Sequence, residues 1–148
     1  GQPRLTHHVM IATVTGVAPF ISMIRAHRNE LQRGAREAHQ ILLVHGASRA
    51  SEFGDYKDEL MEIARAGWLS YIPTVSRWQA DSRWQAEVGR VEDVVRKHAD
   101  QLGFDHTNAI AYLCGNPQMI ENLKGILQRA RFPEAQIKKE LYYRLHHG

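Results

Sequence analysis

Two short turns in this sequence carry residue types that bind a ligand through the backbone. The first turn, residues 13–20, reads Thr-Val-Thr-Gly-Val-Ala-Pro-Phe and follows an apolar run. A glycine between a strand and a helix lets the backbone approach a ligand closely, and the start of the helix offers free N–H groups and a partial positive charge to an anion, typically a phosphate. Pro19 suits the first turn of a helix, where its missing N–H costs nothing. Because the turn lacks the Gly-x-Gly-x-x-Gly dinucleotide motif, an ordinary strand–turn–helix is an equally good interpretation.

The second turn, residues 114–117, reads Cys-Gly-Asn-Pro and also joins an apolar run to a helix-like segment. Its small, flexible glycine again opens the junction between the two elements. A free cysteine is more often a small buried side chain than a reactive group. Taken alone, this turn therefore leaves both interpretations of Cys114 open.

The elements that must position these turns alternate along the chain. Strand-like apolar runs occupy residues 8–13, 40–45, 68–75 and 109–114. Helix-like segments occupy residues 17–33, 55–65, 91–102 and 117–130, and the chain ends in residues 137–145. This alternation predicts βαβ units in a three-layer α/β/α Rossmann-like domain with a mostly parallel sheet of about five strands. Ligands of such sheets bind at the carboxyl ends of the strands, where both turns are expected.

Composition narrows the class of protein. The 148 residues suit one domain over 1–148, with residues 77–89 as its longest loop. The net charge of +3, from 19 basic and 16 acidic residues, is too small and too scattered for nucleic-acid binding but compatible with an anionic cofactor. The single cysteine excludes an internal disulfide or a four-cysteine cluster within this chain and favours a reducing, cytoplasmic setting.

The sequence does not indicate a membrane span, a secretory signal or a metal site. No run of about 18 apolar residues predicts a membrane span, and the N-terminus lacks the apolar region of a secretory signal. The abrupt start before the first strand is compatible with a cut made in a longer chain. Of the nine histidines, the adjacent pairs His7-His8 and His146-His147 lack metal-ligand spacing, so no metal site is expected.

Taken together, the two turns resemble those of the ferredoxin–NADP⁺ reductase family. They occur in the family's order, and the run Cys-Gly-Asn-Pro-x-Met-Ile from residue 114 is the most specific part of the match. Residues 44–49 (Val-His-Gly-Ala-Ser-Arg) and 75–77 (Val-Ser-Arg) look like the family's second and third strand ends. The resemblance covers nearly the whole chain.

The resemblance implies an NADP(H) site. The first turn would cradle the pyrophosphate, and Cys114 would lie beside the nicotinamide and position it for hydride transfer to the flavin. The implied backbone and turn residues are Thr15, Gly16, Val17, Ala18, Pro19, Gly115, Asn116, Pro117 and Met119. The 2′-phosphate would be held by Ser48, Arg49, Ser76, Arg77 and Arg90. Arginine suits this task because its guanidinium binds phosphate through two parallel hydrogen bonds, although Glu52 and Asp55 nearby leave NAD open.

This chain departs from the family's pattern in three ways. The first turn has Val14 where the family has glycine, and a β-branched side chain resists positive φ and crowds the backbone. The acidic-plus-aromatic ending places Tyr142 and Tyr143 as candidates to stack on the flavin, but five residues follow them. The flavin-binding domain is absent from this sequence, so the resemblance implies a longer polypeptide in which the missing domain holds most of the FAD. That protein would exchange electrons with ferredoxin or flavodoxin as its partner. Two alternatives remain: the NADH-binding domain of an oxygenase reductase, and a non-catalytic interaction module that kept the fold.

Overall fold

Strands and helices alternate along the chain as the sequence predicts. The computed structural model describes residues 5–77, 79 and 83–139, with only the backbone at residue 15. The strands are β1 (His7–Thr13), β2 (Gln40–Ala47), β3 (Leu69–Val75), β4 (Glu87–Val88), β5 (Ala109–Cys114) and β6 (Ile137–Lys138). The α-helices are α1 (Ala18–Gln32), α2 (Tyr56–Ala64), α3 (Val91–Leu102) and α4 (Pro117–Arg129). Short 3₁₀ helices, among them η1 (Val14–Val17) and η2 (Ala50–Phe53), follow β1 and β2.

The six strands form one parallel sheet in the order β4-β3-β2-β1-β5-β6. The parallel sheet and its four long strands are confirmed. The two additional strands, β4 and β6, have two residues each and lie at the edges. A two-residue strand is too short to produce an alternating pattern, which is why the expectation was about five strands.

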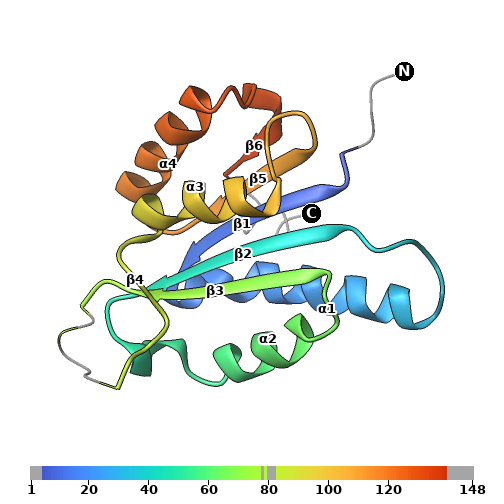
Figure 1. Cartoon of the computed structure of the whole chain (residues 1–148), viewed down its shortest axis with the longest axis horizontal. Coiled ribbons are helices and arrows are strands. Elements are labelled where there is room, and N and C mark those ends of the chain that lie inside the picture. The colour runs from blue at the N-terminus through green and yellow to red at the C-terminus, as the bar shows by residue number, and fades with distance from the viewer. Residues whose placement is uncertain (1–4, 78, 80–82, 140–148) are drawn as a thin grey trace.

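Helices cover both faces of the sheet. In Figure 1, α1 and α2 lie on one face and α3 and α4 on the other. Alternate residues of β1 serve the two cores: Met10 and Ala12 join the cluster under α1 and α2, whereas Val9 and Ile11 join the cluster under α3 and α4. Because both faces are covered, the central strands are continuously apolar, as expected for buried parallel strands.

The chain reverses its direction across the sheet beside β1. It passes from β1 to β2 and β3 on one side and later returns to place β5 on the other side of β1. The chain therefore continues from β1 and from β5 into helices on opposite faces of the sheet, and ligands of such sheets bind near this switch point at the carboxyl edge. Both turns singled out in the sequence lie at this switch point, because β1 ends at Thr13 and β5 at Cys114.

Candidate functional site

A cavity of about 480 Å³ opens at the carboxyl edge of the sheet. It is lined by the residues that follow five strands and by the first turns of two helices. The lining residues are Thr13, Val14, Gly46, Ala47, Ser48, Ser76, Arg77, Gly89, Arg90, Val91, Glu92, Asn116, Gln118, Met119 and Asn122. Helices α1, α3 and α4 begin within five residues of the ends of β1, β4 and β5 at this edge, so their N-terminal partial positive charges also lie there.

The two turns are in close contact with each other. A Cβ atom built on Gly16 would lie 3.0 Å from the carbonyl oxygen of Cys114 and 3.5 Å from its Sγ. Any larger residue at position 16 would therefore push the two turns apart. The two turns are approximately 100 residues apart in sequence. The pairing of β1 with β5, in which Ala12 is opposite Cys114, brings them together.

Val14 adopts a backbone conformation that is unusual for its residue type. Its φ is +47°, a region that costs a β-branched residue about 1–2 kcal/mol. The side chain packs against a small cluster formed by Ala47, Phe53 and Val75 beneath the cavity. This packing offsets part of the backbone cost and explains how a valine is accommodated where the sequence predicted crowding. Val14 also lines the cavity.

His45, near the end of β2, lies beneath the same turn. Its imidazole is fully buried, with Nε2 3.0 Å from the carbonyl oxygen of Val14 and Nδ1 2.8 Å from the hydroxyl of Tyr71. Burial lowers the pKa of His45 to about 4, so the ring is neutral at pH 7. Phe53 contacts the ring edge-to-face at 4.9 Å between centroids.

The second turn is shaped by contacts among its own residues. Asn116 caps α4, since its Oδ1 accepts a hydrogen bond from the backbone N–H of Met119 at 2.8 Å. Met119 folds back so closely that a Cβ on Gly115 would lie 2.5 Å from its Cε, so a larger residue at position 115 would require the methionine side chain to move. Pro117 occupies the first position of the helix.

Cys114 is half-buried and packs against the core under α1 and α2. Burial raises the pKa of its thiol above the ordinary value, so the sulfur is protonated at neutral pH. A protonated thiol is a poor nucleophile. Whether Cys114 positions a ligand, as the resemblance implies, stays a prediction.

The predicted phosphate-binding side chains do not all face the cavity. Ser48, Ser76, Arg77 and Arg90 line it, and both arginines are exposed. Arg49 is exposed but is not among the lining residues, and its backbone N–H donates to Glu52 Oε1 at 2.8 Å.

The acidic residues considered in the sequence lie outside the lining. Glu52 is held by the hydrogen bond from the Arg49 backbone, and Asp55 precedes α2 as its N-terminal flanking residue. In the described part of the chain, Glu92 is the one carboxylate that lines the cavity, together with the two guanidinium groups of Arg77 and Arg90. The lining therefore favours an anionic ligand.

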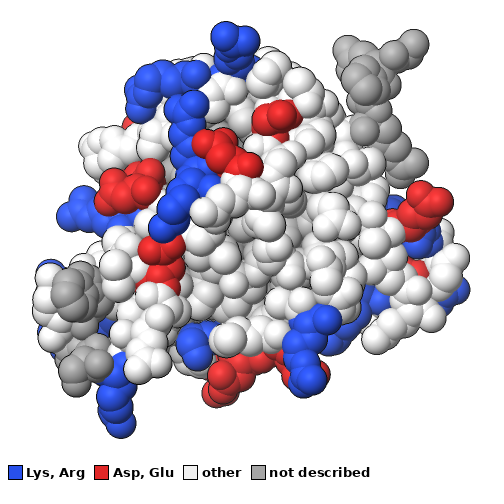
Figure 2. All heavy atoms as spheres, viewed as in Figure 1, with Lys and Arg blue, Asp and Glu red and all other residues white. Residues whose placement is uncertain are grey.

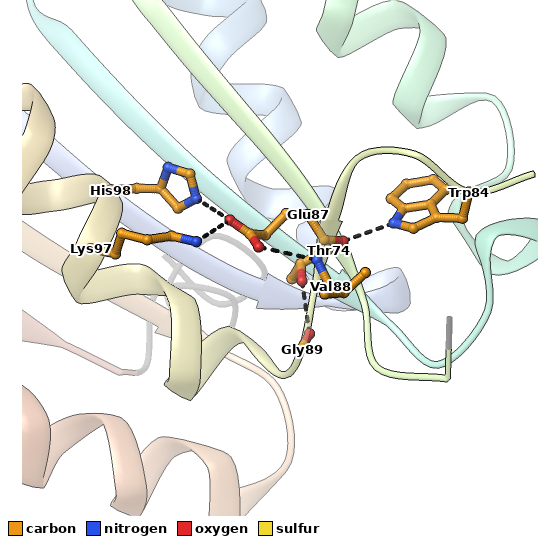
Figure 3. A network of polar contacts seen from close by, with 7 residues as sticks. All are labelled: Thr74, Trp84, Glu87, Val88, Gly89, Lys97 and His98. Carbon is orange, nitrogen blue, oxygen red and sulfur yellow. Dashed lines mark hydrogen bonds and ion pairs between the residues drawn. The ribbon is translucent and has the colours of Figure 1, made fainter. Parts of the chain in front are cut away.

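A polar network holds the loop between β3 and α3 against the rest of the domain (Figure 3). One Glu87 carboxylate oxygen lies 2.7 Å from both Lys97 Nζ and His98 Nε2 on α3. The hydrogen bond from Lys97, followed by that from His98, lowers the pKa of Glu87 to about 2. The buried Thr74 hydroxyl donates to the Gly89 carbonyl at 2.7 Å, and Trp84 Nε1 donates to the Glu87 carbonyl at 2.8 Å. These contacts fix the segment that leads directly to Arg90.

Several predicted residues support the site without lining its cavity. Val17 and Pro19 are buried in the core, and the remaining members of this group are Gly16, Ala18, Cys114, Gly115 and Pro117. The side chain of Thr15 lies outside the described part of the structure. Tyr142 and Tyr143 lie outside the described residues.

Some lining residues were not expected from the sequence. They are Gly46, Ala47, Gly89, Val91, Glu92, Gln118 and Asn122. A rule that included every residue within four positions of a strand end would have found all of them except Asn122, which lies in the second turn of α4.

Charge is dispersed over the face of the molecule drawn in Figure 2. Figure 2 shows Lys and Arg side chains interspersed with Asp and Glu on the viewed face, rather than gathered into a patch of one sign. Within the described residues, no helix is long and apolar enough to cross a membrane. The same residues contain no group of three or more His, Cys, Asp and Glu side chains arranged to hold a metal ion.

Comparison with known proteins places the chain in a family. Residues 10–125 match the oxidoreductase NAD-binding domain family. The chain belongs to this family. Membership confirms the resemblance to ferredoxin–NADP⁺ reductases. It also identifies the class of ligand of this domain as a nicotinamide nucleotide.

Individual relatives belong to several kinds of reductase. The NAD-binding domain is 33% identical over 138 residues to the reductase component of phenol 2-monooxygenase from Pseudomonas sp. (strain CF600), covering 91% of this chain and 36% of that protein. It is 33% identical over 110 residues to NADPH–cytochrome P450 reductase from Oryctolagus cuniculus, covering 73% of this chain and 15% of that protein. A ferredoxin NADP⁺ reductase structure from Neisseria gonorrhoeae with bound FAD and NADP shares the fold, with a TM-score of 0.70 at 21% identity over 93% of this chain and 56% of that chain. The chain spans about a third or less of the length of these two curated relatives.

Proposed function

We propose that this domain binds NADP(H) in the cavity at the carboxyl edge of its sheet. The observation that carries the proposal is the lining itself: two arginines and two serines follow β2, β3 and β4, while the two ligand-binding turns meet at the switch point beside β1. Arg77 and Arg90 are suited to the 2′-phosphate, which distinguishes NADP from NAD. The N-terminus of α1 suits the pyrophosphate.

The chain's own groups bind and orient the nucleotide. Bound NADP(H) supplies the hydride chemistry, and the protein contributes binding, orientation and electrostatics. With the pyrophosphate at η1 and the 2′-phosphate at Arg77, the nicotinamide lies toward the turn at Cys114. The half-buried thiol and the Gly115 backbone then form one wall of the nicotinamide position, while Met119 supports that wall from below.

We further propose that the domain belongs to a longer polypeptide with an FAD-binding domain. Alignments that cover only 36% and 15% of two relatives support a larger protein. In that protein hydride passes between NADPH and FAD, and single electrons pass to or from ferredoxin or flavodoxin. Tyr142 and Tyr143 remain candidates to contact the flavin. The 148-residue chain alone is expected to bind nucleotide weakly and to catalyse no turnover.

The second candidate is the NADH-binding domain of an oxygenase reductase. It is favoured by the similarity to the phenol 2-monooxygenase reductase component and by Glu92 in the cavity lining, since a carboxylate can bind ribose hydroxyls and repel a 2′-phosphate. Calorimetric titration of the chain with NADP⁺ and with NAD⁺ separates the two. Tighter binding of NADP⁺ supports the proposal, whereas equal or tighter binding of NAD⁺ supports the alternative. If neither nucleotide binds even at millimolar concentration, the non-catalytic interaction module that kept the fold is supported instead.

A further inference from the structure

One buried polar side chain beneath the first turn is not accounted for by packing. His45 is fully buried in β2, between the apolar Val44 and the cavity-lining Gly46. Burying an imidazole is unfavourable unless its nitrogens are hydrogen-bonded. Both nitrogens have partners, one of them the backbone of the first turn. The histidine therefore connects the core to that turn.

The identity of the two partners fixes the tautomer. The Val14 carbonyl only accepts hydrogen bonds, so His45 Nε2 carries the hydrogen and donates it across 3.0 Å. Nδ1 is then the acceptor, and the Tyr71 hydroxyl donates to it across 2.8 Å. Because burial lowers the pKa of His45 to about 4, this neutral, singly protonated ring is the state present at neutral pH.

The same hydrogen bond orients the peptide between Val14 and Thr15. This peptide is trans, since the described chain contains no cis bond, so its C=O and N–H point in opposite directions. With the Val14 oxygen directed at the buried His45, the N–H of Thr15 points away from the core. Rotation of this peptide by half a turn would instead turn the carbonyl oxygen outward, where it would repel a phosphate.

We propose that His45 is a positioning residue of the dinucleotide site: its Nε2–H holds the Val14 carbonyl inward and so presents the Thr15 N–H to the pyrophosphate. The inference rests on the proposed function. Val14 has a positive φ, which a β-branched residue does not favour by itself. The hydrogen bond from His45 therefore helps to hold Val14 in this conformation. Tyr71 contributes by holding the imidazole in the donating tautomer.

The test uses the ¹⁵N-labelled chain and three variants. His45→Phe removes the donor while keeping an aromatic ring. His45→Gln keeps an N–H that can reach the Val14 carbonyl. Leu42→Ala, at a fully buried position of the same strand in the other core cluster, is the control for lost stability. Inorganic pyrophosphate is the probe because it isolates the turn from the rest of the nucleotide, and NADP⁺ is titrated in parallel.

In the wild type we expect pyrophosphate to shift the amide signals of Thr15 and Gly16. His45→Phe should weaken pyrophosphate binding about tenfold or more and abolish the Thr15 shift. The reason is that the Thr15 N–H would no longer be held in position to donate to the anion. His45→Gln should recover most of the affinity, and Leu42→Ala should melt at a lower temperature yet bind like the wild type.

The inference is overturned if His45→Phe binds pyrophosphate with the affinity of the wild type or with the affinity of Leu42→Ala. It is also overturned if the amide signals of Thr15 and Gly16 in the wild type do not shift when pyrophosphate is added. If pyrophosphate binding depends on His45 as described but the chain does not bind NADP⁺, the proposed function is contradicted. The role of His45 in positioning the turn is supported in that case.

Discussion

Gly16 and Cys114 approach so closely that a Cβ on the glycine would lie 3.0 Å from the cysteine carbonyl oxygen. This contact joins the turn after β1 to the turn after β5, the two strands at the switch point of the sheet. In the proposed complex, the same contact sets the distance between the pyrophosphate and the nicotinamide. The two turns therefore act as one unit, and a change in either should alter the binding of both parts of the nucleotide.

Gly16→Ala should weaken NADP⁺ binding about tenfold and lower the free energy of unfolding by about 1–2 kcal/mol, because the added methyl meets backbone rather than a movable side chain. Calorimetry and urea unfolding measure the two effects. The matched control is Gly125→Ala in the interior of α4, where alanine is the better helix former and should raise stability without changing affinity. Unchanged affinity in Gly16→Ala would contradict the coupling of the turns.

Arg77→Ala should weaken NADP⁺ binding by about 10- to 100-fold, since it removes a charge-assisted contact to the 2′-phosphate. NAD⁺, which lacks this phosphate, should bind with unchanged affinity. The control is Arg65→Ala at the end of α2, an exposed arginine paired with Glu62 that is not among the cavity-lining residues. Equal losses for NADP⁺ and NAD⁺ would place Arg77 elsewhere on the nucleotide.

Glu87→Gln should reduce the free energy of unfolding at pH 7 by about 1–2 kcal/mol, because the carboxylate accepts charge-assisted hydrogen bonds while its side chain is 17% exposed. Its pKa is lowered from 4.5 to about 2 in the folded state, so the stabilisation is complete above pH 4.5 and is lost as the pH falls toward 2. Thermal unfolding of both proteins from pH 7 to pH 2.5 measures the difference.

The control for this prediction is Glu62→Gln, whose exposed pair with Arg65 should contribute little. A difference between wild type and Glu87→Gln that stays constant down to pH 2.5 would contradict the assignment. A second readout is NADP⁺ affinity, which should fall modestly in Glu87→Gln because the network holds the segment leading to Arg90.

Much of the fold was predictable because its elements have strong local signals. The structure has α3 at residues 91–102 and β5 at residues 109–114, as the sequence predicted, and the other long elements agree within about two residues. Continuous apolar runs mark strands buried on both faces, and a glycine after α3 adopts the left-handed conformation that ends a helix.

The parts that could not be predicted depend on contacts between residues distant in sequence. His45 and Val14 are separated by 31 positions, and nothing local to either residue indicates their hydrogen bond. Glu87 finds Lys97 and His98 only once α3 packs on the sheet. Arg49 illustrates the converse: its position after a strand end predicted a cavity residue, yet the start of η2 carries it out of the lining.

Acid should destabilise the domain in a defined window. Burial lowers the pKa of His45 and of His8 to about 4, so between pH 6.5 and pH 4 the unfolded chain binds more protons than the folded one. Stability is therefore full above pH 6.5 and decreases as the pH falls toward 4, by about 1–3 kcal/mol for each histidine. Urea unfolding between pH 7.5 and pH 4 should show this slope, and His45→Gln should make it shallower. Parallel curves for the two proteins would contradict the buried, neutral state of His45.

The most direct test of nucleotide binding at the carboxyl edge is an NMR titration of the ¹⁵N-labelled chain with NADP⁺. We expect the shifted amides to cluster after β1, β3 and β5, at residues 13–17, 76–77 and 115–116, with NAD⁺ producing smaller shifts after β3. Shifts confined to the amino-terminal edge of the sheet, or no shifts at millimolar NADP⁺, would contradict the proposed site.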